Sequence, residues 1–209
     1  MLRRFLASFA REQTAAITVE FVVVMTFFIT VTFFVIEVAI AQFWWQTAEK
    51  AVQIGARLAV VSNPAVTAIT SSTTNPLASG GAFGQPCPSN CDVSGLTGCT
   101  SATSCTWTCT GGGAGCSTTP FNYIVNRMRQ MYVPIQNSNV TITYTYTGLG
   151  YAGGPLTPTV TVTLSNVPLK LGFISIIGNL MGTSAAPFFQ IPTMSATITG
   201  EDLQSSQSS

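Results

Sequence analysis

All six cysteines of the chain lie in one segment, and they are the residues best able to bind a metal or to change redox state. They stand at positions Cys87, Cys91, Cys99, Cys105, Cys109 and Cys116. Two of the pairs have three intervening residues, a spacing that zinc ligands often show. A zinc site would nevertheless leave two cysteines over, and the chain has no histidine to complete a mixed site. Because clustered cysteines in an oxidising compartment form disulfides, we predict disulfides with the pairing left open, and neither a metal nor another cofactor.

The remaining polar residues do not suggest a catalytic site. Without histidine, a Ser-His-Asp triad is impossible. Outside the N-terminal part of the chain the acidic residues are Asp92, Glu201 and Asp202, which do not provide the facing carboxylates that glycoside hydrolysis needs. A formal net charge of +1 gives no concentrated basic surface for nucleic acid. The composition therefore predicts a protein that is not an enzyme and does not bind nucleic acid.

Two carboxylates stand in a long apolar run near the N-terminus. Glu20 is followed at once by Phe21, and Glu37 comes 17 residues later, roughly 25 Å along a helix. A charged side chain at the centre of a bilayer costs about 2.5–3.5 kcal/mol on insertion scales, so it usually has a partner and a function. At the two boundaries of the membrane the cost is small. Two interpretations therefore remain for each carboxylate: a solvated position at the membrane interface, or a contact with another subunit.

These carboxylates are positioned by a helix that we predict over residues 16–61. Its first part, about 17–43, is long enough to cross a hydrocarbon core, which takes roughly 20 residues. The Phe-Trp-Trp run at 43–45 is typical of the aromatic belt at a membrane interface. Over 46–61 apolar residues recur with gaps of three and four, which predicts an amphipathic continuation packed on a body outside the membrane. The apolar run is too long for a cleavable secretory signal, the rival interpretation.

The charges around this span predict its orientation. Arg3, Arg4 and Arg11 precede the apolar run, and the nearest positive charges after it are Lys50 and Arg57. Basic residues gather on the cytoplasmic side of membrane proteins. We therefore expect residues 1–15 to be a basic cytoplasmic leader and the body to lie outside the cell or in the periplasm. Disulfides persist in such oxidising compartments, and a surface with few charges is also expected there.

The rest of the sequence predicts a small α+β body. Residues 62–119 are rich in Ser, Thr and Gly and are expected to form a loop that contains the cysteine module. Residues 120–203 combine a helical pattern with alternating strand patterns that form an antiparallel sheet. We predict a helix over 121–132, strands over 139–147, 157–166 and 191–200 with a fourth strand unplaced, a short helix over 169–181, and a polar tail over 204–209.

The sequence AAITVEF at residues 15–21 resembles the prepilin processing site of type IV pilin-like proteins. The helix that follows resembles the TadE-like pseudopilins of the tight-adherence (Tad) pilus, and the residues that carry this likeness are Ala48, Ala51, Gly55, Ala56 and Arg57. The resemblance implies a pilin-like α+β fold. In it, a long N-terminal helix, first transmembrane and then amphipathic, packs on a small antiparallel β-sheet beside a disulfide-rich loop module.

The resemblance also implies how the N-terminus would be used. A prepilin peptidase would cut between Ala15 and Ala16 on the cytoplasmic face, which makes Glu20 the fifth residue of the mature chain. Ala15 takes the place that Gly usually has in the family. The Glu20 carboxylate would neutralise the new α-amino group on a neighbouring subunit, and the Glu20-Phe21 pair is the variant associated with minor pseudopilins.

The protein so implied is a minor pseudopilin that takes part in assembly, initiation or a tip or adhesive function of a Tad-type pilus. Its partners would be the prepilin peptidase, other Tad pilins and pseudopilins, the inner-membrane assembly platform and membrane lipid. It would cross the bacterial inner membrane once, or reside in the pilus. The alternative is a permanently anchored binding or scaffold protein that is not processed, and the absent histidine disfavours a third class, an anchored hydrolase.

Overall fold

The computed structural model divides the chain into two compact units. One comprises Met1–Phe43 and Lys170–Phe188, and the other comprises Trp44–Leu169 and Phe189–Ser209. The structure describes residues 13–70, 78–79, 84–87, 91–92, 99–101, 104–151, 156–169, 172 and 190–200. The polar tail predicted over 204–209, most of the basic leader, and most of the short helix predicted over 169–181 lie outside the described residues.

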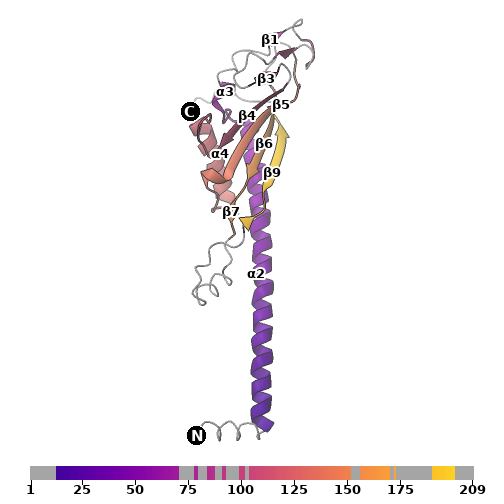
Figure 1. The fold of residues 1–209 in the computed structure, drawn as a ribbon, viewed down its shortest axis with the longest axis vertical. Helices are drawn as coiled ribbons and strands as arrows, with labels where there is room; N and C mark the ends of the chain where they lie inside the picture. The colour runs from indigo at the N-terminus through magenta and orange to yellow at the C-terminus, as the bar shows by residue number, and fades with distance from the viewer. Residues whose placement is uncertain are drawn as a thin grey trace. The chain divides into compact units, whose positions relative to one another are not determined.

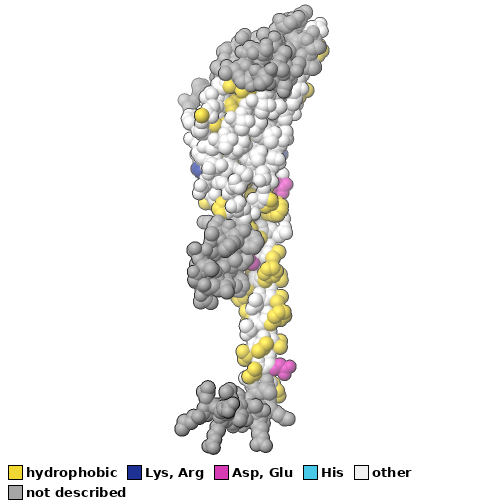
Figure 2. Space-filling model, viewed as in Figure 1, with side chains coloured by type: hydrophobic (Ala, Val, Ile, Leu, Met, Phe, Trp, Pro, Cys, Tyr) yellow, Lys and Arg dark blue, Asp and Glu magenta, His cyan; other side chains and the backbone are white. Residues whose placement is uncertain are grey.

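Helix α2 (Gln13–Val61) is continuous over 49 residues and is drawn in indigo and purple in Figure 1. It ends where the sequence predicts, just before Asn63-Pro64, because the residue before a proline is forced out of the helical region. In the first unit its large apolar side chains, from Ile17 to Phe43, are 42–71% exposed, and Figure 2 shows apolar side chains gathered along this helix. Within the described part of the chain, α2 is the one helix long and apolar enough to cross a membrane.

Three threonines in the apolar part of α2 form hydrogen bonds from their side-chain hydroxyls to the backbone of the same helix. The Oγ1 atoms of Thr26, Thr30 and Thr32 donate to the carbonyl oxygens four residues earlier, at 2.7–2.8 Å. In hydrocarbon an unpaired hydroxyl is costly, and back-bonding of this kind removes the cost without a neighbouring helix. These three threonines are therefore compatible with a lipid surrounding.

The second unit contains a five-stranded antiparallel sheet in the order β3-β4-β5-β6-β9. Its strands are β3 (Cys99–Ser101), β4 (Ser104–Thr110), β5 (Val140–Tyr146), β6 (Thr159–Leu164) and β9 (Met194–Thr199). The predicted hairpin of residues 139–147 and 157–166 is confirmed as β5 and β6, with Tyr144 opposite Val160, and the third predicted strand is β9. The predicted fold class, a long apolar helix packed on a small antiparallel sheet, is correct.

Two strands of this sheet, β3 and β4, fall where the sequence predicted a loop, and β4 is the longer of them. Residues 104–110 belong to the cysteine module, yet they form β4, and residues 105–110 pair with residues 141–146 of β5. The inward face of β4 alternates Cys105, Trp107 and Cys109, all buried, so the period-2 pattern of a strand is present. Two of the three inward residues are cysteines, so the strand lacks most of the β-branched and aromatic residues that usually mark one. The sheet thus has two strands more than the three that the sequence places.

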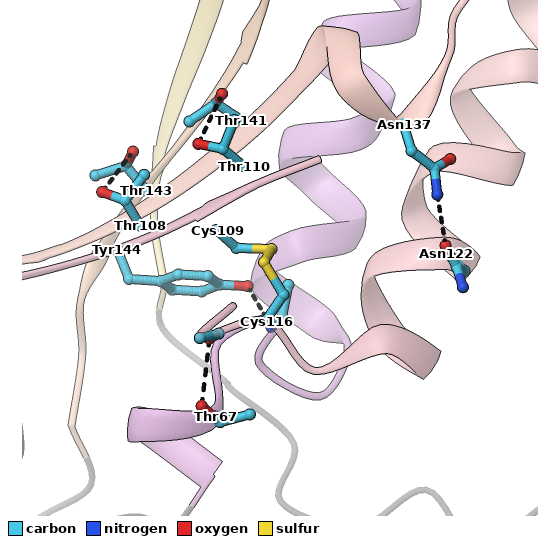
Figure 3. Close-up of a disulfide and its surroundings, with 12 residues drawn as sticks. Thr67, Thr108, Cys109, Thr110, Cys116, Asn122, Asn137, Thr141, Thr143 and Tyr144 are labelled. Carbon is cyan, nitrogen blue, oxygen red and sulfur yellow. Dashed lines mark hydrogen bonds between the residues drawn. A yellow bond between two sulfur atoms is a disulfide. The ribbon is translucent and has the colours of Figure 1, made fainter. Parts of the chain in front are cut away.

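The opposite face of the sheet is lined by hydroxyl side chains. Every second residue of β4, β5, β6 and β9 is Thr or Ser and lies on this face, and these residues stand opposite one another in register. Several pairs are within hydrogen-bonding distance: Thr161 and Thr197 at 2.9 Å, Thr110 and Thr141 at 3.3 Å, and Thr108 and Thr143 at 3.5 Å. Figure 3 shows the last two pairs. Cross-strand threonine pairs of this kind stabilise a sheet by about 0.2–1 kcal/mol each.

Short elements complete the second unit. They are α3 (Thr67–Thr70), α4 (Thr118–Met131), the 3-10 helix η1 (Asn137–Asn139), and two small antiparallel pairs, β1 (Ala78–Ser79) with β2 (Cys91–Asp92) and β7 (Val167–Pro168) with β8 (Gln190–Ile191). Helix α4 confirms the helix predicted over 121–132 and buries Phe121, Ile124, Val125 and Met128. Together with the second part of α2, it covers the apolar face of the sheet with one hydrophobic core.

Candidate assembly site

Helix α2 carries the four residues that the sequence assigns to processing and assembly. Ala15 and Ala16 lie in its first turn, since the helix begins at Gln13. Glu20 follows Ala16 by one turn on the same side, because residues four apart are neighbours on a helix surface. Glu20 is exposed, and Phe21 is 62% exposed. A second chain could therefore reach both side chains without a rearrangement of α2.

Glu37 differs from every residue around it. It is 6% exposed, whereas Ile36 and Val38 on either side are 48% and 45% exposed. In this structure the Glu37 side chain is therefore shielded from solvent by the chain itself. A buried carboxylate must be hydrogen-bonded or paired to offset its lost hydration, and Glu37 does have an interaction partner. Glu20 and Glu37 thus occupy different environments on one continuous helix.

In the second unit, the aromatic residues at the start of this part of α2 have separate roles. The Trp44 ring lies 5.6 Å from the Tyr132 ring, at a tilt of 53°, which is a favourable distance for an aromatic pair. Tyr132 is 1% exposed and donates its hydroxyl to the Pro168 carbonyl at 3.1 Å. Trp45 is 48% exposed. Of the two predicted belt tryptophans, Trp44 therefore packs on the body and Trp45 remains available to an interface.

A stripe of small residues lets α2 approach α4 closely. Its members are buried and lie on one side of α2: Ala48, Ala51, Gly55, Ala56 and Ala59. At the centre, a Cβ added to Gly55 would lie 2.7 Å from Met128 Sδ, well inside van der Waals contact. Any larger residue at this position would require the Met128 side chain to move. The small residues that carry the likeness to pseudopilins therefore have a packing role within this chain.

Tyr144 links the end of α2 to the sheet through hydrogen bonds. Its hydroxyl accepts a hydrogen bond from the Ala65 N–H at 3.1 Å and donates one to the Ala59 carbonyl at 3.4 Å. Burial raises the pKa of Tyr144 to about 12, and the hydrogen bond with Ala65 opposes that shift in part. The sequence predicted Tyr144 on a strand but could not predict this contact, which joins residues 85 positions apart.

Residues 15–57 match the family model described as TadE-like protein. This N-terminal segment is TadE-like. The match confirms the resemblance that the sequence showed, and it lies entirely within α2. The TadE-like segment starts at Ala15, includes Glu20, Phe21 and Glu37, and ends at Arg57, within the part of α2 that packs on the body. No curated protein and no solved structure matches the chain.

The cysteine module lies outside the TadE-like segment. Cys109 and Cys116 form a disulfide, shown in Figure 3 close to the Tyr144 ring. Cys87 and Cys105 are also disulfide-bonded, whereas the side chains of Cys91 and Cys99 are not among those described. A sulfur in a disulfide is not a thiolate ligand for zinc. In the described part of the module the cysteines therefore act as covalent cross-links, as the sequence predicts.

The disulfide between Cys109 and Cys116 ties the end of β4 to the start of α4. Cys116 lies just before α4 begins, and the neighbouring Ser117 N–H donates to the Ala65 carbonyl at 2.8 Å. Thr67 donates its N–H to the Gly115 carbonyl at 3.0 Å. These hydrogen bonds join the cross-linked loop to the segment that follows α2. The disulfide and these hydrogen bonds therefore hold the same region together.

Proposed function

We propose that this chain is a membrane-anchored minor pseudopilin of a Tad-type pilus. The observation that carries the proposal is the coincidence of the TadE-like match, residues 15–57, with the helix that could span a membrane. A TadE-like protein is associated with the Tad pilus and has a structural role, so we infer a structural subunit and not an enzyme. Its partners would be other components of the pilus and the inner-membrane assembly platform.

The proposed arrangement places the N-terminus in the cytoplasm and the body in the periplasm or outside the cell. Arg3, Arg4 and Arg11 on one side of the span support this orientation, since positive residues favour the cytoplasmic side. The disulfide between Cys109 and Cys116 supports it from the other side, because disulfides persist in oxidising compartments. The protein would thus cross the inner membrane once.

In this proposal a prepilin peptidase cuts the bond between Ala15 and Ala16. The bond lies in the first turn of α2, where the backbone N–H groups have no partners within the helix. Unwinding that turn costs little, so the peptidase can bind the chain in an extended form. The small side chains on both sides of the bond also suit a narrow cleft.

Cleavage would create an α-amino group at Ala16, four residues before Glu20. In a filament whose core is apolar, an uncompensated ammonium and an uncompensated carboxylate are both costly. We infer that the exposed Glu20 carboxylate pairs with the α-amino group of a neighbouring subunit and so favours assembly over isolated subunits. The body, which is large beside a membrane helix, suits an initiating, capping or adhesive subunit.

A permanently anchored scaffold protein is the second candidate, and the state of the N-terminus distinguishes the two. The test is the intact mass and N-terminal sequence of the membrane-extracted full chain, produced with and without a prepilin peptidase. We expect a new N-terminus at Ala16 only when the peptidase is present. A start at Met1 or Leu2 under both conditions would overturn the pseudopilin proposal and leave the fixed anchor.

A further inference from the structure

Strand β9 has an open edge. It is the last strand in the order β3-β4-β5-β6-β9, and the described part of the chain places no strand on its other side; Figure 1 draws it in yellow. The Gly200 N–H donates to the Pro158 carbonyl at 2.8 Å, in register with the β6–β9 pair. Since successive residues of an antiparallel pair point their N–H and C=O groups alternately toward and away from the partner strand, Ser195, Thr197 and Thr199 present theirs at the open edge.

The side chains of β9 are also less covered than those of the strand beside it. On β6, the inward residues Val160, Val162 and Leu164 are 0–1% exposed. The inward residues of β9 are half-buried and pack against the margin of the same core: Met194, Ala196 and Ile198. On the hydroxyl face, the Ser and Thr residues of β9 are exposed, whereas those of β6 are half-buried. One more strand beside β9 would therefore bury side chains on both faces.

The two edges of the sheet differ in how well they resist pairing with another chain. Proteins protect sheet edges with very short strands, bulges, prolines or charges. Strand β3, at the other edge, has three residues and a register shift against β4. Strand β9 pairs with β6 over six consecutive residues without such a shift, and it contains neither a charged residue nor a proline. Of the two, β9 is the edge that is suited to accept a further strand.

We propose that β9 is an interaction surface at which an extended segment of a different pilus subunit adds one strand to the sheet. The proposal rests on the function proposed above, in which a minor subunit has mainly other subunits as its neighbours. A row of backbone N–H and C=O groups is complementary to another extended backbone, and pairing of this kind is a common mode of peptide recognition. The occupant is therefore a strand.

The faces of β9 define the chemistry of the added segment. Because β9 is uncharged, with Ser and Thr on one face and apolar residues on the other, the segment should be uncharged and should alternate hydroxyl and apolar side chains. Its hydroxyl residues would then continue the cross-strand pairing that already joins Thr161 to Thr197 at 2.9 Å. Its apolar residues would cover the margin of the core.

A proline at position 197 tests the proposal in the full-length protein. Proline is tolerated in an edge strand where the missing N–H faces away from the sheet, so Thr197→Pro should keep the pairing of β9 with β6. We expect this variant to be inserted and cleaved like the native protein, but to be present in sheared pili at a level lower by roughly tenfold or more, because an edge hydrogen bond is lost and the ring occupies the position of the added strand. Thr197→Val keeps the N–H and should be incorporated normally.

Photo-cross-linking in assembled pili identifies the occupant. The cross-linking residue benzoylphenylalanine replaces Thr197 in one variant and Thr108 in another. Thr108 is exposed on the same face of the sheet, but it lies on β4, three strands from β9 and so roughly 14 Å away. We expect position 197 to form an adduct with an uncharged extended segment of a different pilus subunit, identified by mass spectrometry of the joined peptides, and position 108 to form little or none.

Several results would overturn the proposal. Normal incorporation of Thr197→Pro would show that the edge of β9 is not used. Equal cross-linking from position 108 would assign the contact to the hydroxyl face, and an adduct with a second copy of this chain would replace the proposed occupant. In each of these cases the native protein is still cleaved and found in pili, so the proposed function stands. If the native protein were neither cleaved nor found in pili, both proposals would fail.

Discussion

Tyr144 is a residue whose ionisation is linked to the stability of the whole body. Its hydroxyl is the partner of the Ala65 N–H and of the Ala59 carbonyl, and its pKa is raised to about 12, chiefly by burial. The folded chain therefore favours the neutral hydroxyl more strongly than the unfolded chain does. This contribution to stability is fully present below about pH 10 and is lost as the pH rises toward 12.

We expect Tyr144→Phe to lower the free energy of unfolding at neutral pH by about 1–3 kcal/mol, because the buried Ala65 N–H loses its partner. Between about pH 10 and pH 12 the advantage of the native protein over this variant should fall by roughly 3 kcal/mol, at about 1.4 kcal/mol per pH unit. The measurement is denaturant unfolding of the detergent-solubilised full chain across this range. The curves of the two proteins should converge.

The matched control for this prediction is Tyr123→Phe. Tyr123 is on α4 and is 45% exposed, so this variant should unfold as the native protein does at every pH. Burial also raises the pKa values of Tyr132 and Tyr146, but both residues are present in all three proteins. If the difference in unfolding free energy between the native protein and Tyr144→Phe stayed constant up to pH 12, the raised pKa of Tyr144 would be contradicted.

At the scale of elements, the close approach of α2 and α4 depends on Gly55. Met128 is fully buried, and its Sδ atom fills the space that a Cβ at Gly55 would need. We expect Gly55→Leu to destabilise the protein by about 1–3 kcal/mol, as overpacked cores do, despite the better helix propensity of leucine. The measurement is the thermal midpoint of unfolding of the full chain in detergent.

A second substitution separates overpacking from a general effect of leucine on the helix. Met128→Ala opens space opposite residue 55, so the double variant with Gly55→Leu should lose less stability than the sum of the two single variants. Gln53→Leu changes an exposed position of the same helix and should leave the midpoint nearly unchanged. Additive losses in the double variant would show that the two helices are not in contact at this point.

The elements themselves were largely predictable from the sequence, because their signals are local. A run of apolar residues without Pro or Gly until Gly55 predicts α2, and alternation of Thr with Val, Ile or Tyr predicts β5 and β6. Strand β4 was missed because cysteines fill its inward positions. Contacts between distant residues, such as Trp44 with Tyr132 or Ala65 with Tyr144, depend on the packed fold, and no spacing in the sequence encodes them.

At the scale of the whole molecule, the two carboxylates in the apolar part of α2 predict different consequences for assembly. Glu37 is already buried within the chain, whereas Glu20 is exposed on the apolar part of the helix. Of these two carboxylates, Glu20 is the one exposed at the surface of the chain. In the proposed filament, the Glu20 carboxylate would pair with the new α-amino group of Ala16 on a neighbouring subunit.

We expect Glu20→Ala to leave membrane insertion and cleavage intact but to prevent incorporation of the subunit into pili, because the α-amino group of Ala16 would remain unpaired in an apolar core. Insertion is measured by alkaline extraction of membranes, cleavage by intact mass, and incorporation by immunoblotting of sheared pili. Glu49→Ala, at an exposed carboxylate of the same helix in the body, should be incorporated normally. Normal incorporation of Glu20→Ala would show that charge neutralisation does not drive assembly, and Glu20→Gln would then be expected to assemble as well.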